Sequence, residues 1–240
     1  MAFVLAVVLN GTAAEAGPPY VTDDPVPTDY RNWEIYTGVT YENEGGGTLS
    51  AALPFAEFNY GAMPNVQVSA TLPFAANVAP GAQQYGYGPT EFGVKTRFVQ
   101  ETADRPQISF YPSIEIPASG GGHVQTFLPL WLQKSSGPWT AFGGGGLNLD
   151  ATPGERNSLF VGGALERTLS PGTTIGAEVY RQGETQVGIG GTTAANIGVI
   201  GQVGTYHAVL LSFGRALQRT NTLSIYTSYE FALGPRGAVP

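Results

Sequence analysis

Residues 91–98 read EFGVKTRF, and this stretch decides between the fold classes open to the chain. Its even-numbered positions hold Phe, Val, Thr and Phe, whereas three of its odd-numbered positions hold the charged residues Glu91, Lys95 and Arg97. Because successive side chains of a β-strand point to opposite faces, the stretch predicts a strand with one apolar face and one polar face.

The same alternation recurs along the whole chain and predicts about twelve strands. Most of them are longer than the usual soluble strand of about 5–6 residues and match the roughly 9–11 residues that cross a membrane at a tilt. The expected strands lie near 32–42, 48–60, 66–75, 90–100, 107–116, 123–134, 139–149, 158–169, 173–181, 193–203, 207–215 and 222–232.

The composition excludes a large helical domain. The 240 residues include 34 Gly and 18 Pro, and in a helix interior each Pro costs about 3 kcal/mol and each Gly about 1 kcal/mol. Charged residues make up 12% of the chain and cysteine is absent, so the fold does not depend on disulfides, and the length fits one domain. Pro54, Pro73, Pro112 and Pro129 fall inside predicted strands and predict bulges there, because proline donates no hydrogen bond to a sheet.

Five of the predicted strands show which face is which. Those near 32–42, 66–75, 90–100, 107–116 and 222–232 have an apolar face without a charge and an opposite face of Ser, Thr, Gln and charged residues. Lipid would enforce this pattern, because a charge on a lipid-facing position costs up to about 2–4 kcal/mol at the midplane. The sequence therefore predicts an all-β fold, a closed antiparallel transmembrane β-barrel of about 12 strands over residues 32–232.

A soluble sandwich or lipocalin-like barrel would also alternate, with its apolar face turned inward. Three features favour the transmembrane barrel over it. The polar faces are poor in Lys and Glu for a solvated surface, and aromatic residues such as Trp33, Phe98 and Tyr229 stand near strand ends, as in interfacial girdles. Short connections such as 63–65 and 136–138 also alternate with longer ones such as 76–88 and 182–192, as they do in bacterial barrels.

Both ends of the chain lie outside the predicted barrel. Residues 1–16 combine a short apolar run with Ala14-Glu15-Ala16 and predict a signal peptide without its basic n-region, so we expect the natural precursor to begin upstream. A buried first strand is the alternative. We assign residues 17–31 to a periplasmic N-terminal arm, which could instead fold into the lumen as a plug, and residues 233–240 to a C-terminal tail.

The segment GPPYVTDDPVP at 17–27, followed by NWE at 32–34 and by LPF at 53–55 and 72–74, resembles a proteobacterial family of outer-membrane transporters. Members of this family bear a meta-pathway phenol-degradation label. The resemblance implies an outer-membrane β-barrel that admits small hydrophobic or aromatic compounds. Residues 229–231, YEF, resemble the terminal aromatic signal that the barrel assembly machinery reads, although nine residues follow it.

The charged residues of the polar faces are the candidate lumen lining. With seven acids and two bases they would favour cations or neutral polar solutes, as charged rings do in channels. The alternative is structural: Lys95 and Arg97 could pair with Glu91 and Glu115 and satisfy buried charges. The predicted lining residues are Glu34, Glu57, Glu91, Lys95, Arg97, Glu115, Glu166, Glu178 and Glu230.

Other chemistries find less support in the sequence. Asp23-Asp24 could bind Ca²⁺, but further ligand spacing is lacking and Asp-Pro is a common turn signal, so we expect no metal and no cofactor. His207 and Ser212 are an odd number of residues apart, so in one strand their side chains face opposite ways, and His123 is the one other histidine. We therefore expect no enzyme activity.

Passive passage of small solutes, some of them hydrophobic, is the function that the sequence favours. Outer-membrane lipids, a small-molecule solute and the barrel assembly machinery are the expected partners. Nucleic acid is not, because the net charge is −7 and no basic patch exists. A closed structural or adhesive barrel and a secreted soluble binding barrel are the alternatives.

Overall fold

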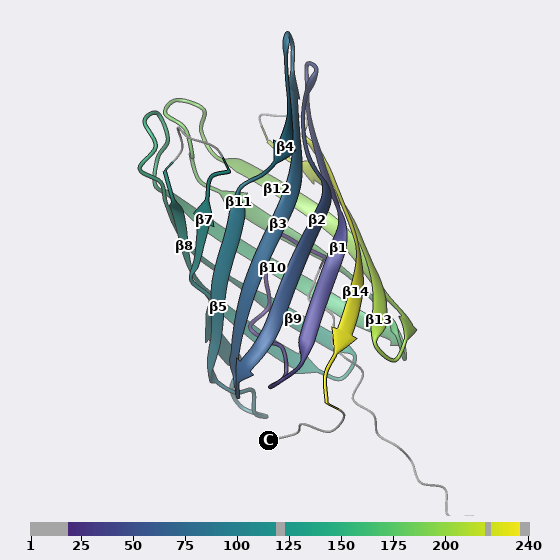
Figure 1. Cartoon of the computed structure of the whole chain (residues 1–240). Helices are drawn as coiled ribbons and strands as arrows, with labels where there is room; N and C mark the ends of the chain where they lie inside the picture. The colour runs from purple at the N-terminus through teal and green to yellow at the C-terminus, as the bar shows by residue number, and fades with distance from the viewer. Residues whose placement is uncertain (1–18, 119–122, 219–221, 236–240) are drawn as a thin grey trace, which may run out of the picture.

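The computed structural model describes residues 19–118, 123–218 and 222–235. The predicted signal peptide at 1–16 and the end of the tail at 236–240 lie outside the described residues. The described chain forms one antiparallel sheet that closes on itself (Figure 1). None of the described residues belongs to a helix long and apolar enough to cross a membrane.

Closure comes from the pairing of the first strand with the last. Trp33 lies opposite Leu233 and the two strands stay in register as far as Asn43 and Leu223. The strands are β1 (Trp33–Gly45), β2 (Thr48–Met63), β3 (Val66–Ala79), β4 (Ala82–Tyr87), β5 (Thr90–Val99), β6 (Gln107–Phe110), β7 (Ser113–Ile116), β8 (Gln125–Ser136), β9 (Trp139–Leu149), β10 (Ser158–Ser170), β11 (Thr173–Gln182), β12 (Thr192–Gly204), β13 (His207–Ala216) and β14 (Leu223–Leu233).

These fourteen elements make a twelve-stranded barrel, which confirms the predicted fold. β4 and β5 pair in succession with β3, and β6 and β7 pair in succession with β5 and β8, so each couple fills one position in the ring. The predicted strand at 107–116 is thus interrupted at Tyr111 and Pro112. Pro129 of β8 lies beside this interruption and accepts a hydrogen bond from the Tyr111 amide at 3.2 Å.

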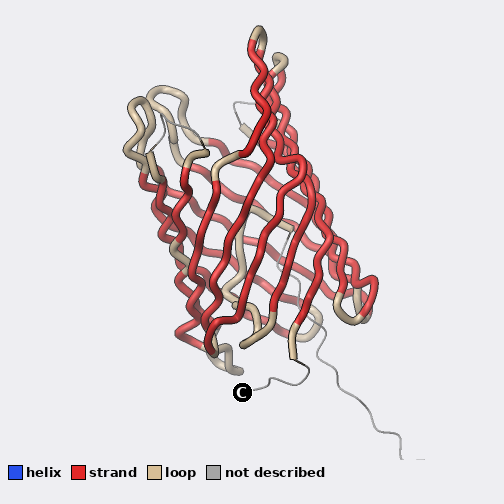
Figure 2. Tube along the Cα trace, in the orientation of Figure 1, coloured by secondary structure: helices blue, strands red, loops and turns tan. Residues whose placement is uncertain are grey.

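The expected bulge at Pro54 is present, because the register between β2 and β3 shifts between Ala52 and Phe55. The predicted long connection at 76–88 is wrong in one respect, since it contains β4. That strand pairs with the end of β3, and the resulting hairpin rises beyond the barrel beside the β1–β2 hairpin (Figures 1 and 2). The AQQYGY sequence of β4 has no apolar face, as suits a hairpin that stands clear of the wall.

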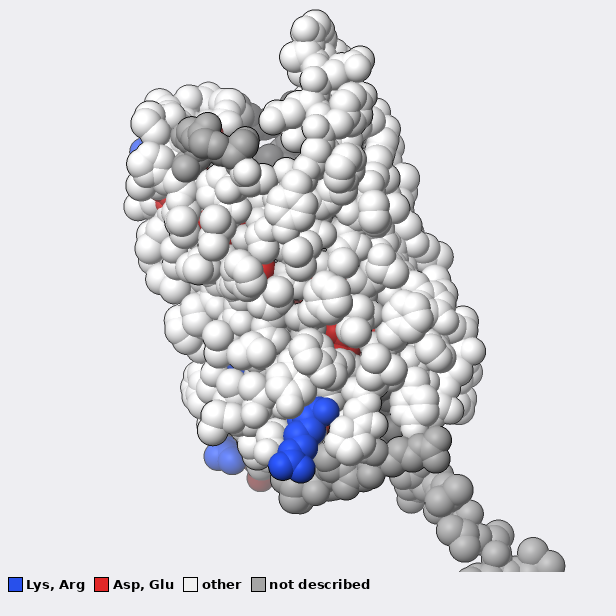
Figure 3. Space-filling model, viewed as in Figure 1, with Lys and Arg blue, Asp and Glu red and all other residues white. Residues whose placement is uncertain are grey.

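The outer face of the barrel is apolar and exposed. Phe92, Val94 and Phe98 point outward, whereas Lys95 between them is buried. The buried set includes many polar side chains, among them Gln67, Ser69, Ser109, Ser113, Asn196 and Glu230. In Figure 3 the side of the barrel shows few charges, and the Lys and Arg atoms in view gather mainly at the lower end. The apolar-out, polar-in prediction is therefore confirmed.

The two rims of the barrel differ. One rim carries the short turns at 64–65, 137–138, 171–172 and 205–206 together with the longer connection at 100–106, and the other carries the raised hairpins and the other long connections (Figure 2). Aromatic side chains line the outside of the short-turn rim: the rings of Trp33 and Tyr60 are 4.6 Å apart, and His207 lies against Tyr229 and Phe231. The predicted aromatic placement at strand ends is found on this rim.

Candidate functional site

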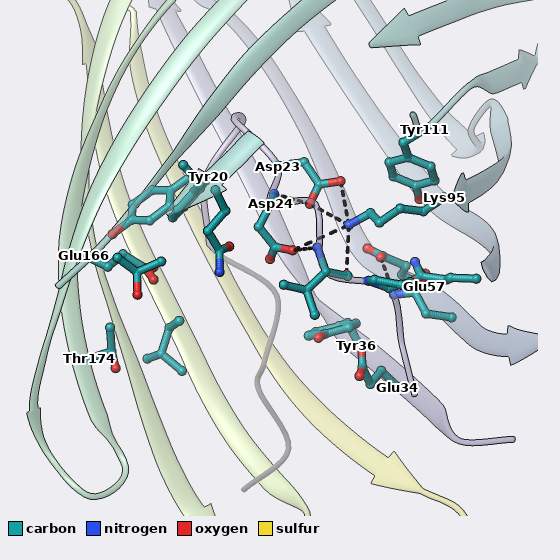
Figure 4. A pocket seen from close by; sticks show the side chains of 18 of the residues that line it. Tyr20, Asp23, Asp24, Glu34, Tyr36, Glu57, Lys95, Tyr111, Glu166 and Thr174 are labelled. Atoms are coloured by element: carbon teal, nitrogen blue, oxygen red, sulfur yellow. Dashed lines mark hydrogen bonds and ion pairs between the residues drawn. The ribbon is translucent and has the colours of Figure 1, made fainter. Parts of the chain in front are cut away.

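The N-terminal arm, residues 19–31, lies inside the barrel (Figures 1 and 4). This corrects its assignment to the periplasm and agrees with the alternative of a segment folded into the lumen. The physical reason is that the wall supplies buried partners for the arm's amides and carboxylates. From Pro19 the arm starts beside β11 and β12, crosses to β5 and β3, and then joins β1 at the short-turn rim.

Glu178 of β11 holds the first part of the arm. Its carboxylate accepts hydrogen bonds from the backbone amides of Val21 at 2.8 Å and Thr22 at 2.9 Å. The side chain of Asn196, on the neighbouring β12, also donates to it. Glu178 is 2% exposed, and among the described residues its charge is compensated by these amide donors. Each charge-assisted bond of this kind contributes about 1.5–3 kcal/mol.

Lys95 of β5 holds the middle of the arm from the other side of the lumen. Its ammonium lies 3.0 Å from Oδ2 of Asp23 and 3.9 Å from Oδ1 of Asp24. It also donates to the Val26 carbonyl at 3.5 Å and sits 4.9 Å from the centre of the Tyr111 ring. Figure 4 shows Lys95 reaching both aspartates. Lys95 is 5% exposed, and removing one partner of such a buried pair typically costs about 3–5 kcal/mol.

The last part of the arm is fixed by Thr28. Its amide donates to Oε1 of Gln67 at 2.8 Å and its hydroxyl donates to Oε2 of Glu34 at 2.9 Å. Arg31 has a positive φ of 66° and its amide donates to the Gly61 carbonyl at 2.7 Å. Gly61 is required there, since a Cβ at that position would lie 1.9 Å from the Asp29 carbonyl oxygen.

An acid-lined cavity of about 470 Å³ remains beside the arm. Glu34, Glu57 and Glu91, with Lys95 next to them, form what we call the acidic wall, and Glu166 lies across the cavity. Tyr20, Tyr36, Tyr111 and Tyr226 also line the cavity. Burial, with Glu166 and Glu178 nearby, raises the pKa of the Tyr20 phenol above its ordinary value, so this group stays neutral. The cavity therefore combines negative charge with aromatic faces.

The opposite side of the lumen is aromatic. Phe127, Trp131, Phe160 and Tyr180 of β8, β10 and β11 form what we call the aromatic wall, with neighbouring ring centres 5.8–6.3 Å apart. Trp131 is 2% exposed and faces Gly144, its partner on β9. The glycine tract at 143–146 thus gives room to an inward aromatic side chain. The arm itself meets Gly162, where a Cβ would lie 2.1 Å from Oγ1 of Thr22.

Two further features belong to the lumen. A second apolar cluster, Tyr36, Phe55, Ile200, Ala208 and Leu210, packs inside the barrel. A cavity of about 550 Å³ lies at the long-loop rim and is lined by Tyr85, Tyr87, Glu115, His123 and Asp150 among others. The interior is consequently less uniformly polar than the alternation predicts.

The nine predicted lining residues fall into four groups. Glu34, Glu57, Glu91, Lys95 and Glu166 line the inner cavity, Glu115 lines the outer one, and Glu178 and Glu230 are buried in the interior. Arg97 bonds to Asn65 at 2.8 Å and to Gln107 at 3.0 Å near the short-turn rim. Among the described residues, Lys95 forms its ion pairs with Asp23 and Asp24 of the arm, and not with Glu91 or Glu115 as the structural alternative expected.

The Asp23-Asp24 pair binds Lys95, and within the described ranges no three His, Cys, Asp or Glu residues are grouped as metal ligands would be. His207 lies among outer aromatic rings, and the amide of His123 donates to Thr152. Sequence reasoning missed the partners of Lys95 and Glu178. The TDDP motif at 22–25 was the signal that could have found them, because acidic residues in an arm need a basic partner once they are buried.

No protein-family model and no curated protein matches the chain. Solved structures do. The chain is similar to the COG4313 outer membrane channel from Pseudomonas putida F1, with a TM-score of 0.68, 8% identity and coverage of 87% of this chain and 97% of that chain. It is similar to the KdgM porin in complex with disordered oligogalacturonate, with a TM-score of 0.61, 9% identity and coverage of 82% and 98%.

The translocator domain of the autotransporter NalP from Neisseria meningitidis also matches, with a TM-score of 0.56, 13% identity and coverage of 86% and 89%. At these identities the likeness shows the fold, a closed antiparallel barrel of the outer-membrane kind. Channels, porins and a translocator domain share it, so function has to be argued from the lumen.

Proposed function

We propose that this protein is a bacterial outer-membrane channel for the passive passage of small solutes. The observation that carries the proposal is the contrast between the two faces of one closed sheet: exposed apolar side chains outside, and buried charged and polar side chains with a cavity of about 470 Å³ inside. Solved barrels of the same fold include an outer membrane channel and a porin, which supports this reading.

The lining indicates which solutes pass. Carboxylates outnumber basic groups around the inner cavity, so anions are disfavoured relative to cations and neutral molecules. The aromatic wall and the apolar cluster around Phe55 and Leu210 suit small apolar or aromatic molecules. This agrees with what the resemblance to phenol-pathway transporters implies. With the arm in place, size restricts passage to small solutes.

A closed structural barrel is the second candidate, and the arm is the observation that favours it. Residues 19–31 cross the lumen and their anchors are buried on both sides. A barrel that stays plugged would conduct no solute and would serve through its outer surface and raised hairpins alone.

Planar-bilayer recordings of the purified protein separate these functions. We expect discrete single-channel steps, with cations passing more readily than anions in a salt gradient, whereas persistent silence supports the closed barrel. Heat-modifiable migration on gels and recovery in the outer-membrane fraction test the location that both share. A protein that washes off membranes in salt without detergent would contradict both and support a soluble barrel.

A further inference from the structure

Two buried side chains on opposite sides of the lumen hold the arm, and they recognise different chemistry. Glu178 binds the amides of Val21 and Thr22, which every residue except proline offers. Lys95 binds the side-chain carboxylates of Asp23 and Asp24. We propose that Glu178 and Lys95 are the positioning residues that keep the channel in its occluded resting state, and that the TDDP motif is the segment they recognise. This rests on the proposed function as a channel.

Burial is the first argument for Lys95. An ammonium group removed from water needs compensation, and in the described residues the arm supplies both carboxylates within 4 Å of it. Withdrawal of the arm would leave Lys95 facing the ring of Tyr111 and the more distant acids of the cavity. Withdrawal would therefore end both ion pairs and leave water entering the lumen to compensate Lys95, whereas the docked arm compensates the charge where water is excluded.

Glu178 is a buried carboxylate, so its case is like that of Lys95 with the opposite charge. It lies on β11, the strand that also carries Tyr180 of the aromatic wall, and its partners in the described structure are two arm amides and the amide group of Asn196. Without the arm, Asn196 is the one of these three partners that would stay bound to the carboxylate. Because each anchor binds a different group of the arm, loss of one leaves the other in place, and the two effects should accumulate.

The absence of cysteine from the sequence permits a direct test of arm position. Thr22 is fully buried, and its hydroxyl has no hydrogen-bond partner among the described residues, so Thr22→Cys is a mild change that reports whether the arm is docked. The rate of thiol labelling by a water-soluble maleimide is measured in the folded, detergent-purified protein. In the otherwise unchanged chain we expect slow labelling, and rapid labelling there would overturn the proposal.

Lys95→Met and Glu178→Gln should each raise the labelling rate by about tenfold or more, and the double variant should exceed both, because each change leaves a buried group without its partner. Lys134→Met and Glu101→Gln are the matched controls. They form an ion pair at 3.0 Å away from the arm, and Glu101 also accepts a backbone amide, that of Ser135. Unchanged rates in both anchor variants, with the controls also unchanged, would refute the proposal.

Charge exchange provides a readout that a general loss of packing would not give. Lys95→Glu should release the arm, and adding Asp23→Lys should restore slow labelling because the pair is re-formed with reversed signs. Failure of the exchange to restore slow labelling would show that Lys95 does not position the arm through charge. If a wall variant does not fold on heat-modifiability gels, Asp23→Asn with Asp24→Asn tests the same contact from the arm, leaving the wall intact.

Bilayer recordings of the same variants keep this proposal distinct from the proposed function. Anchor variants should show larger or more frequent conducting steps than the unchanged chain. If labelling is faster in the anchor variants but the bilayers stay silent, the role of the anchors is supported and the channel function is contradicted. If the protein conducts but labelling is unchanged in the anchor variants, the channel function is supported and the role of the anchors is contradicted.

Discussion

The acidic wall and the aromatic wall face each other across one lumen, and the arm touches both. On the acidic wall, Lys95 offers a charge that selects carboxylates. On the side of the aromatic wall, Glu178 of β11 accepts hydrogen bonds from backbone amides. The difference shows how a barrel interior divides two tasks. Electrostatics on one side fixes which segment of the arm docks, and shape with amide hydrogen bonds on the other side fixes how closely it approaches.

Loss of the Trp131 side chain should have the largest effect, because it removes the centre of the aromatic wall. The side chain is almost fully buried and contacts Phe127 and Phe160, so Trp131→Ala should lower the free energy of unfolding by about 3–5 kcal/mol. Urea unfolding in detergent, followed by gel migration, measures the change. Trp139→Ala is the control, since Trp139 is 43% exposed on the outside. Equal losses in the two variants would contradict an inward aromatic wall.

Gly162→Ala should have a smaller effect, directed at the contact between the aromatic wall and the arm. The new methyl group would meet Oγ1 of Thr22, so we expect a loss of about 1–3 kcal/mol or displacement of the arm. Urea unfolding of Gly162→Ala measures the loss of stability, and thiol labelling of Thr22→Cys combined with Gly162→Ala measures displacement of the arm. Gly163→Ala is the matched control, because its nearest neighbour is 3.9 Å from the new Cβ. A change in Gly163→Ala equal to that in Gly162→Ala would contradict the close contact.

Glu57→Gln should give the smallest effect and refine the role of the acidic wall. Removing one carboxylate from the cavity lining should lower the cation-to-anion permeability ratio by about twofold, without loss of stability beyond that of a surface change. Reversal potentials in a salt gradient measure the ratio. Glu101→Gln removes a carboxylate outside the lining, and an equal shift there would indicate that overall charge, and not the wall, sets selectivity.

Strand positions and the direction of the apolar face were predictable, because apolar and polar side chains alternate along a strand that has lipid on one face and the lumen on the other. Residues 139–149 form β9 as expected, and most other boundaries agree within a few residues. The aromatic wall was harder to assign. In β8 both parities are apolar, with Leu128, Leu130 and Leu132 on one and Phe127 and Trp131 on the other, so alternation there does not distinguish lipid from lumen.

The lumen contacts were not predictable for a different reason. Lys95 lies 72 positions from Asp23, and Glu178 lies 156 positions from Thr22. The alternation of side chains describes one strand at a time, so it does not predict which distant segment of the chain contacts an inward-facing charge. The sequence supports the inward direction of Lys95 and Glu178, whereas their partners depend on the closed ring and on the entry of an arm that has no periodicity of its own.

The seam between β1 and β14 sets an order for biogenesis. The arm precedes every strand of the barrel along the chain, yet one of its two binding sites, on β11, is synthesised after about three quarters of the chain. A nascent chain without β14 has no closed wall, so the arm must be captured while the sheet is still an open, curling ribbon, or be threaded into the finished cylinder. Docking of residues 21–24 is therefore a late event, because it needs β11 as well as β5 in place.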